Sequence, residues 1–130
     1  MADLNDLHKI ALSLPETTHE EGKIAYGVLN KGKSKGIAWV WLERIDPKKA
    51  RVPNPAVIAI RVRNTLEKEM LIEAQPTKFF TEPHYNGFPA ILVRLAAVAV
   101  DELEALITSA WRCQAPPALV KIFDEQNQES

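Results

Sequence analysis

The sequence predicts one α+β domain, a two-layer sandwich in which helices cover one face of a mainly antiparallel sheet of about four or five strands. Three observations predict this fold. Helical and alternating apolar patterns follow one another in the order α-β-β-β-α-β-α, connections of hairpin length join the early strands, and 130 residues suffice for one hydrophobic core. We therefore expect a single domain over residues 1–130, with an ordered core of about 3–123.

The first elements follow from the spacing of apolar residues. Residues 3–14 carry apolar side chains at helical spacing, Asp3 is placed to cap this helix, and Pro15 ends the pattern. Residues 23–29 alternate between two faces, as a half-buried strand does. The polar, glycine-containing residues 30–36 then indicate a hairpin loop.

The next two strands differ in their apolar patterns. Residues 37–42 are apolar on both faces, which predicts a central strand and leaves open which of its faces is exposed. An excursion with charges and two prolines follows over residues 43–55. In the third strand, residues 56–63, Arg61 and Arg63 fall on the face opposite the isoleucines.

A helix and an aromatic loop come next. Asn64 and Glu67 form a pair resembling a capping box, so a helix is expected to start there, and it ends before Pro76. The aromatic loop 79–89 is rich in prolines and contains a glycine, which fix backbone shape, and it leads into a fourth strand at 90–95. The apolar stripe of the expected helix consists of Leu66, Met70, Leu71 and Ala74.

The C-terminal part predicts a second long helix. Asp101 favours its start, apolar residues at helical spacing continue as far as Trp111, and Pro116 marks its end. Residues 118–123 add a short helical turn. The polar residues 124–130 are expected to form a frayed tail.

The net charge of −1 hides an asymmetry along the chain. The segment from Lys23 to Lys68 holds eleven basic and three acidic residues, a balance of +8, whereas the remaining residues hold five basic and fourteen acidic ones, a balance of −9. Such asymmetry points to a basic working surface, with solubility as the alternative explanation. The basic residues expected at the hairpin tip or on the open sheet face are Lys31, Lys33, Lys35, Arg61, Arg63 and Arg94.

These basic residues predict a non-enzymatic domain that binds DNA through the basic hairpin and the open sheet face, weakly and with a strong dependence on salt. Lysines at a hairpin tip contact phosphates without reading sequence, and a solvated loop is the alternative. If Trp39 and Trp41 lie on the open face, basic and aromatic side chains sit together there and their rings could stack on bases.

The aromatic loop 79–89 supports a different function, that of a small-molecule or protein-interaction module. Packing of Tyr85 and Phe88 against the end of the sandwich is the competing structural interpretation of the same loop. The residues that could line a ligand pocket are Trp39, Trp41, His84, Tyr85 and Trp111.

No pattern in the sequence predicts a catalytic site, a metal site or a cofactor. Cys113 lacks any motif context and is expected to be a buried thiol, and the three histidines, His8, His19 and His84, are too dispersed for a metal-binding motif. No apolar run is long enough to cross a membrane, and the acidic start is unlike a signal peptide. We therefore expect a cytoplasmic protein without enzymatic activity, a monomer or a weak homodimer.

Four segments of the sequence match a pattern of residues known from a protein family. They are Leu-Ser-Leu-Pro-Glu-Thr at 12–17, the aromatic loop 79–89, Leu-Val-Arg-Leu at 92–95, and the helix from Asp101 to Arg112. Together they resemble the MmcQ/YjbR family of small bacterial proteins. The resemblance covers roughly residues 4–120, and its second half is the more specific.

This resemblance implies a compact α+β domain of the CyaY-like, frataxin-related architecture, which agrees with the fold predicted from the residues. Members of the family are commonly labelled DNA-binding because of a proposed pair of wing-like β-hairpins. The family offers no established catalytic residues to carry over. Frataxins bind iron through acidic surfaces, but the acidic residues here are scattered, so the resemblance implies no metal site.

Overall fold

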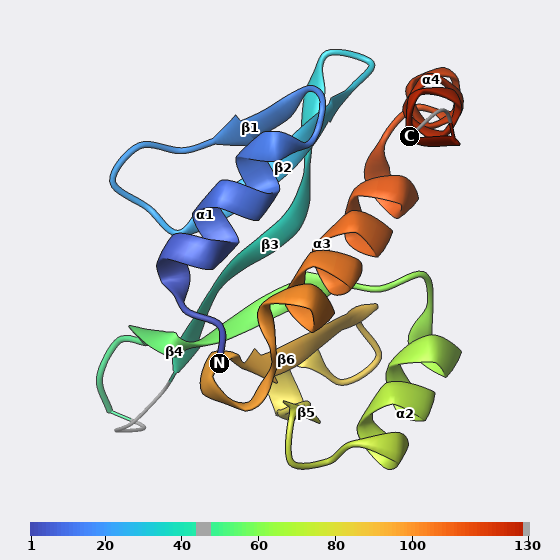
Figure 1. Cartoon of the computed structure of the whole chain (residues 1–130). Coiled ribbons are helices and arrows are strands. Elements are labelled where there is room, and N and C mark those ends of the chain that lie inside the picture. The colour runs from blue at the N-terminus through green and yellow to red at the C-terminus, as the bar shows by residue number, and fades with distance from the viewer. Residues whose placement is uncertain (44–47, 129–130) are drawn as a thin grey trace.

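The computed structural model describes residues 1–43 and 48–128 and has the α+β architecture that the sequence predicts (Figure 1). Arg44 and Asp46 of the basic segment, and the last two residues of the expected tail, lie outside the described residues. The helices are α1 (Leu4–Ser13), α2 (Thr65–Ala74), α3 (Val100–Gln114) and α4 (Pro117–Gln128), with short 3₁₀ helices η1 (Pro83–Tyr85) and η2 (Leu95–Ala97). The strands are β1 (Thr17–His19), β2 (Ala25–Asn30), β3 (Lys33–Glu43), β4 (Val52–Arg61), β5 (Phe79–Phe80) and β6 (Ala90–Arg94).

The strands form one open sheet in the order β1-β2-β3-β4-β6-β5, and every neighbouring pair is antiparallel. The prediction of an antiparallel sheet is confirmed. The sheet has six strands rather than four or five because β1 and β5 extend it at its two edges. These edge strands have three and two residues, too few for an alternating pattern to reveal them.

The β2–β3 hairpin is tighter than expected. Lys31 and Gly32 form the turn, both with positive φ (54° and 78°), and β3 already begins at Lys33. A two-residue turn of this kind matches the twist of the strands it joins. Residues 33–35, predicted to be loop, are therefore part of a strand with fixed faces.

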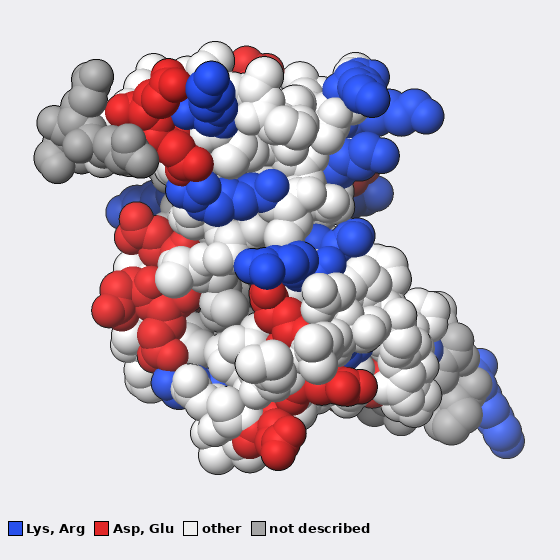
Figure 2. Space-filling model, turned by 90° about the vertical axis from the view of Figure 1, so that its right-hand side faces the viewer, with Lys and Arg blue, Asp and Glu red and all other residues white. Residues whose placement is uncertain are grey.

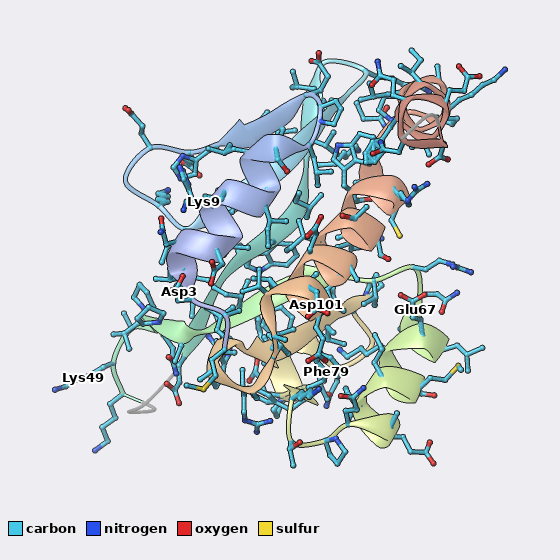
Figure 3. All side chains as sticks on the ribbon, in the orientation of Figure 1. Asp3, Lys9, Lys49, Glu67, Phe79 and Asp101 are labelled. Atoms are coloured by element: carbon cyan, nitrogen blue, oxygen red, sulfur yellow. The ribbon has the colours of Figure 1, made fainter. Side chains whose placement is uncertain are left out.

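Helices α1 and α3 cover one face of the sheet, which we call the helix side (Figure 1). Asp3 caps α1 through a reciprocal pair of bonds, since its carboxylate accepts from the Asp6 N–H (2.9 Å) while that of Asp6 accepts from the Asp3 N–H (3.0 Å). Side chains of both helices and of the strands fill the space between them, with Phe79 near the start of α3 (Figure 3). Fully buried members of this core include Leu7, Val28, Ile37, Ile58, Ile60, Ile91, Leu103, Ile107 and Trp111.

A second, smaller cluster lies on the opposite face of the sheet, which we call the open side. It consists of Val57, Ala59, Tyr85, Ala90 and Leu92, with Trp39, Trp41 and Phe80 packed against them. A register shift between β2 and β3 separates Gly36 from Ala38, and Ile37 joins the helix-side core there. Strict alternation along this strand would put Ile37 on the same face as Trp39 and Trp41, but Ile37 lies on the opposite face.

The two other helices differ from their expected form. On α2, Leu66 and Met70 are 64% and 62% exposed and Ala74 is exposed as well, so three of the four residues of the expected apolar stripe face outward, while Lys68 is buried. This helix lies beside β5 and β6 rather than across the sheet (Figure 1). Helix α4 is longer than the predicted turn and reaches into the expected tail; its Phe123 packs against the core and Asp124 pairs with Arg112 of α3.

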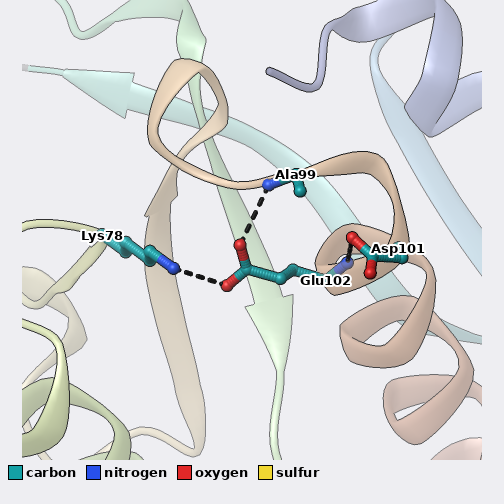
Figure 4. Close-up of polar contacts among 4 residues, drawn as sticks. All are labelled: Lys78, Ala99, Asp101 and Glu102. Atoms are coloured by element: carbon teal, nitrogen blue, oxygen red, sulfur yellow. Dashed lines mark hydrogen bonds and ion pairs between the residues drawn. The ribbon is translucent and has the colours of Figure 1, made fainter.

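Glu102 ties the start of α3 to the turn before β5 (Figure 4). Its carboxylate accepts hydrogen bonds from the Ala99 N–H (3.1 Å) and from Lys78 Nζ (2.7 Å). The side-chain bond to Lys78 and the backbone bond to Ala99 lower the pKa of Glu102 below its ordinary value. None of the helices in the described part of the chain combines the length and apolar character needed to span a bilayer.

Candidate nucleic-acid interface

Trp39 occupies the centre of the open side. It lies in β3 opposite Ala59 of β4, and its Nε1 donates a hydrogen bond to the Tyr85 hydroxyl at 3.1 Å. Its six-membered ring rests against Gly36, where an added Cβ would come within 3.2 and 3.4 Å of two ring carbons. The indole is thus fixed by a hydrogen bond at one edge and by backbone contact below, and it remains half-buried.

Shallow grooves flank Trp39. One, of about 410 Å³, runs along β1, β2 and β3, and its lining includes Thr18, Gly27 and Ser34. The Thr18 and Ser34 hydroxyls share a hydrogen bond of 2.6 Å across it. Another, of about 470 Å³, includes Pro53 in its lining. Trp39 lines both grooves.

Arginines lie over aromatic rings on the same side. The guanidinium carbon of Arg61 is 5.8 Å from the centre of the Phe88 ring, and that of Arg94 is 4.2 Å from the centre of the Phe80 ring. Phe88 is 41% exposed and meets Trp39 edge to face at 6.3 Å. Cation–π pairs of this kind hold the positive charges close to the aromatic surface.

Trp41 is less available than Trp39. It contacts Phe80 edge to face at 5.6 Å, and its Nε1 is buried without a hydrogen-bond partner. Such an atom is uncommon in folded proteins, and the orphaned N–H is a site that a water molecule can satisfy. Of the two tryptophans that the sequence offered for stacking, Trp39 is the better presented.

The pocket residues predicted around the aromatic loop do not all come together. Tyr85 is buried and serves as the anchor of Trp39, so the packing interpretation holds for it. His84 is exposed and meets Tyr85 edge to face. The prediction that Trp111 lines a ligand pocket is wrong. This residue is fully buried on the helix side, where its Nε1 donates a hydrogen bond to the Pro15 carbonyl at 2.9 Å and its ring packs on Phe123.

The six predicted basic residues fall into three groups. Arg61 and Arg94 pair with Ala90 and Val57, so they point to the open side. Lys33 and Lys35 pair with Asn30 and Val28, and Val28 belongs to the helix-side core, so these lysines leave the strand on the helix side. Lys31 sits in the turn, and Arg63 faces Glu67 of α2 at 3.7 Å.

The flank of the molecule on which α2 and α4 lie carries both signs of charge. Lys and Arg side chains gather along one edge of it and cross its middle, while Asp and Glu lie mostly along the other edge and below (Figure 2). On this flank the basic side chains therefore do not form one continuous basic face.

Two further features were missed or misjudged in the sequence. His8 and His19 come together at Tyr26, with a hydrogen bond of 2.9 Å between His8 Nδ1 and the Tyr26 hydroxyl and a stacked contact between the His19 and Tyr26 rings at 4.8 Å. The prediction that Cys113 is a buried thiol is wrong, because the residue is exposed. The neighbouring protein atoms still remove part of the water around its sulfur, and this desolvation, together with the nearby Glu67, raises the pKa of the thiol. Within residues 1–43 and 48–128, no three His, Cys, Asp or Glu side chains gather to hold a metal ion.

The signals for the missed residues are weak but physical. Gly36 stands alone inside a strand, a position that often marks close approach of another group. Phe88 and Phe80 lie in the loop that the sequence singled out, but their partners Arg61 and Arg94 come from other strands. The two histidines are brought together only by the packing of α1 against β1 and β2.

The chain is similar to mycobacterial proteins that are described as uncharacterised, and no family model matches it. Relatives in Mycobacterium bovis and in two strains of Mycobacterium tuberculosis are each 46% identical over 71 residues, which is 55% of this chain and 55% of each relative. The chain thus spans about half the length of the curated relatives it matches.

A crystal structure supports the fold independently. The Deinococcus radiodurans protein DR2400, a DUF419 domain, superposes with a TM-score of 0.60 at 21% identity, over 85% of this chain and 77% of that chain. At this identity the likeness concerns the fold alone. The chain therefore has the fold of a DUF419 domain and relatives among uncharacterised mycobacterial proteins.

Proposed function

We propose that this chain is a non-enzymatic domain that binds DNA, weakly and in a salt-dependent way, on the open side of its sheet. The observation that carries the proposal is the anchored Trp39 ring, which lies between two grooves and beside the exposed Phe88 with Arg61 above it. Trp39 and Phe88 offer surfaces on which bases can stack, and Arg61 and Arg94 offer charge to the phosphates.

Single-stranded DNA suits this surface better than duplex. Stacking on an aromatic ring needs an unpaired base whose face is free, and each such contact is worth about 1–3 kcal/mol. The face has two arginines rather than a continuous basic strip, so its affinity depends on stacking as well as on charge. We therefore expect stronger binding to single strands than to duplex of the same length.

The hairpin lysines act at a distance from the aromatic surface. Lys33 lies six residues before Trp39 on β3, so their Cα atoms are separated by about 20 Å at the usual rise of a strand. Lys33 and Lys35 leave the strand on the helix side, so of the three lysines only Lys31, in the turn, would meet phosphates beyond the stacked bases. Its long side chain adds affinity without sequence preference.

The resemblance to the MmcQ/YjbR family also supports the proposal. Members of that family are commonly labelled DNA-binding on account of their β-hairpins, and the β2–β3 hairpin of this chain carries three lysines at or near its tip. Because of the same resemblance, we also propose that the chain belongs to the MmcQ/YjbR family and has its CyaY-like, frataxin-related architecture.

The test is a titration of labelled single-stranded and duplex oligonucleotides at low and moderate salt. Neutralising about three phosphates, through Arg61, Arg94 and Lys31, predicts that log K falls with log salt at a slope of roughly −2 for single strands and −2.7 for duplex. The slope itself reports the number of phosphate contacts. Absence of binding to either form at low salt overturns the proposal.

A second candidate function rests on the exposed residues of the aromatic loop. His84 and the 41% exposed Phe88 lie close to one another around buried Tyr85, and could dock a protein or a small aromatic ligand. Replacing both residues by alanine separates the candidates. Loss of a protein contact with unchanged DNA affinity favours this second function, whereas reduced DNA affinity favours the first.

A further inference from the structure

Lys68 is buried in an unusual place. It lies in the middle of α2 with 4% of its surface exposed, and it is the one charged side chain that is buried among residues 1–43 and 48–128. Its Nζ donates hydrogen bonds to the carbonyls of Tyr85 (2.5 Å) and Phe88 (3.0 Å). The lysine thus reaches from α2 to both ends of the segment 85–88.

Burying this ammonium group has an energetic cost. Desolvation lowers the pKa of Lys68, and the nearby carboxylate of Glu82 opposes that shift. A buried charge is tolerated only when polar partners compensate for lost hydration, and here two backbone carbonyls do so. A methionine of similar length would fill the same space without that cost, but it could not hold the two carbonyls.

The two carbonyls belong to the residues that build the candidate interface. The Tyr85 hydroxyl accepts the hydrogen bond from Trp39 Nε1, and the Phe88 ring lies beneath Arg61 and against Trp39. The same carbonyls also accept from the Phe88 and Ala90 N–H groups within the loop, at 3.0 and 2.8 Å. One buried ammonium therefore fixes the backbone that positions the stacking ring and the guanidinium.

We propose that Lys68 is a positioning residue for the DNA-binding surface: it holds Tyr85 and Phe88 so that Trp39 and Arg61 are presented to the strand, while it contacts no part of the strand itself. This inference rests on the proposed function. It assigns to α2, which lies away from the open side, an indirect part in binding. It also predicts a specific signature, because a residue that touches no phosphate leaves the salt dependence unchanged.

The experiment compares Lys68→Met with Lys78→Met, a matched loss of one positive charge at the Glu102 contact of α3. We expect Lys68→Met to weaken binding to a labelled oligothymidylate about tenfold at every salt concentration, with the slope of log K against log salt unchanged. Lys78→Met should retain the wild-type affinity. A slope reduced by about 0.7 in Lys68→Met would instead mean direct phosphate contact and would overturn the inference.

Two further measurements keep the test decisive. Should Lys68→Met not fold, Tyr85→Phe removes only the hydroxyl that holds Trp39, and it should weaken binding about threefold, again with an unchanged slope. Hydrogen exchange of residues 85–90 reports the loop without any ligand, and it should speed up in Lys68→Met and not in Lys78→Met.

The outcomes separate the two ideas. If the wild type binds no oligonucleotide, the proposed function fails and the exchange data still show whether Lys68 holds the loop. If the wild type binds and a folded Lys68→Met binds equally well, the positioning inference fails and the proposed function stands.

Discussion

The two faces of the sheet use tryptophan in opposite ways. On the helix side, Trp111 is fully buried among aliphatic side chains and its N–H is satisfied by a backbone carbonyl. On the open side, Trp39 is half-buried among other aromatic rings and arginines, and its N–H is satisfied by a tyrosine hydroxyl. The first arrangement maximises burial, whereas the second fixes the orientation of a ring that solvent can still reach. We infer that the helix side determines stability and the open side determines binding.

The largest expected effect is on the helix side. Trp111→Ala should reduce the free energy of unfolding by about 3–5 kcal/mol, because it removes a large buried ring and leaves a cavity. Chemical denaturation monitored by circular dichroism measures this loss. Trp39→Ala is the matched substitution on the other face and should lose much less stability. Equal losses for the two variants would abolish the distinction between the faces.

The second effect concerns affinity. Trp39→Ala should weaken binding to single-stranded DNA by about 1–3 kcal/mol, roughly tenfold or more, through loss of one stacked base. Trp41→Ala is the control, since this ring is held against Phe80 and is less well presented. Fluorescence anisotropy with a labelled oligonucleotide gives both affinities. A larger loss for Trp41 than for Trp39 would move the stacking site along β3.

A third and smaller effect, on the salt dependence of DNA binding, distinguishes Arg61 on the open side from Arg63 beside α2. Arg61→Ala should reduce the magnitude of the salt slope by about 0.7 for single strands, because one phosphate contact is lost. Arg63→Ala, which removes a charge that faces Glu67 next to α2, should leave the slope unchanged. If the two variants behave alike, the strand does not lie on the open side.

The smallest effect concerns pH and the start of α3. The lowered pKa of Glu102 means that its contacts to Lys78 and Ala99 stabilise the fold fully above the unfolded pKa of the carboxyl, and that this contribution disappears as the pH falls through the folded value. Glu102→Gln should therefore flatten the fall in Tm with acidification. Glu104→Gln, on the exposed side of the same helix, is the control. Identical acid profiles for the two variants would argue against the contribution of Glu102.

Much of the architecture could be predicted because it follows from local patterns. The helices around Leu7 and Leu103 and the strand around Ile58 bury the side chains that periodicity assigned to the core. The edge strands could not be predicted, since two or three residues carry no periodicity. Helix α4 contacts the rest of the fold through Phe123 and through the pair of Arg112 and Asp124, and spacing alone does not reveal these contacts.

For the candidate site, the sequence predicted some of the residues but not the contacts between them. The sequence indicated that Trp39 shares a face with Arg61 if the tryptophans lie on the open face, but nothing local shows that the Tyr85 hydroxyl of the loop accepts a hydrogen bond from the indole N–H. The sequence also treated the hairpin lysines as a flexible tip, and the tight turn at Lys31 assigns Lys33 and Lys35 to the other side. Tertiary contacts decide both questions, and they join residues that are tens of positions apart.

The two short edge strands have a consequence for the behaviour of this protein in solution. A sheet whose rim strand is long and unpaired is a template for other chains, and such rims promote aggregation. Here the longest strands, β3 with eleven residues and β4 with ten, lie inside the sheet, while the rims are formed by β1 and β5 with three and two. The rims at β1 and β5 therefore offer few backbone groups to which another chain could add a strand.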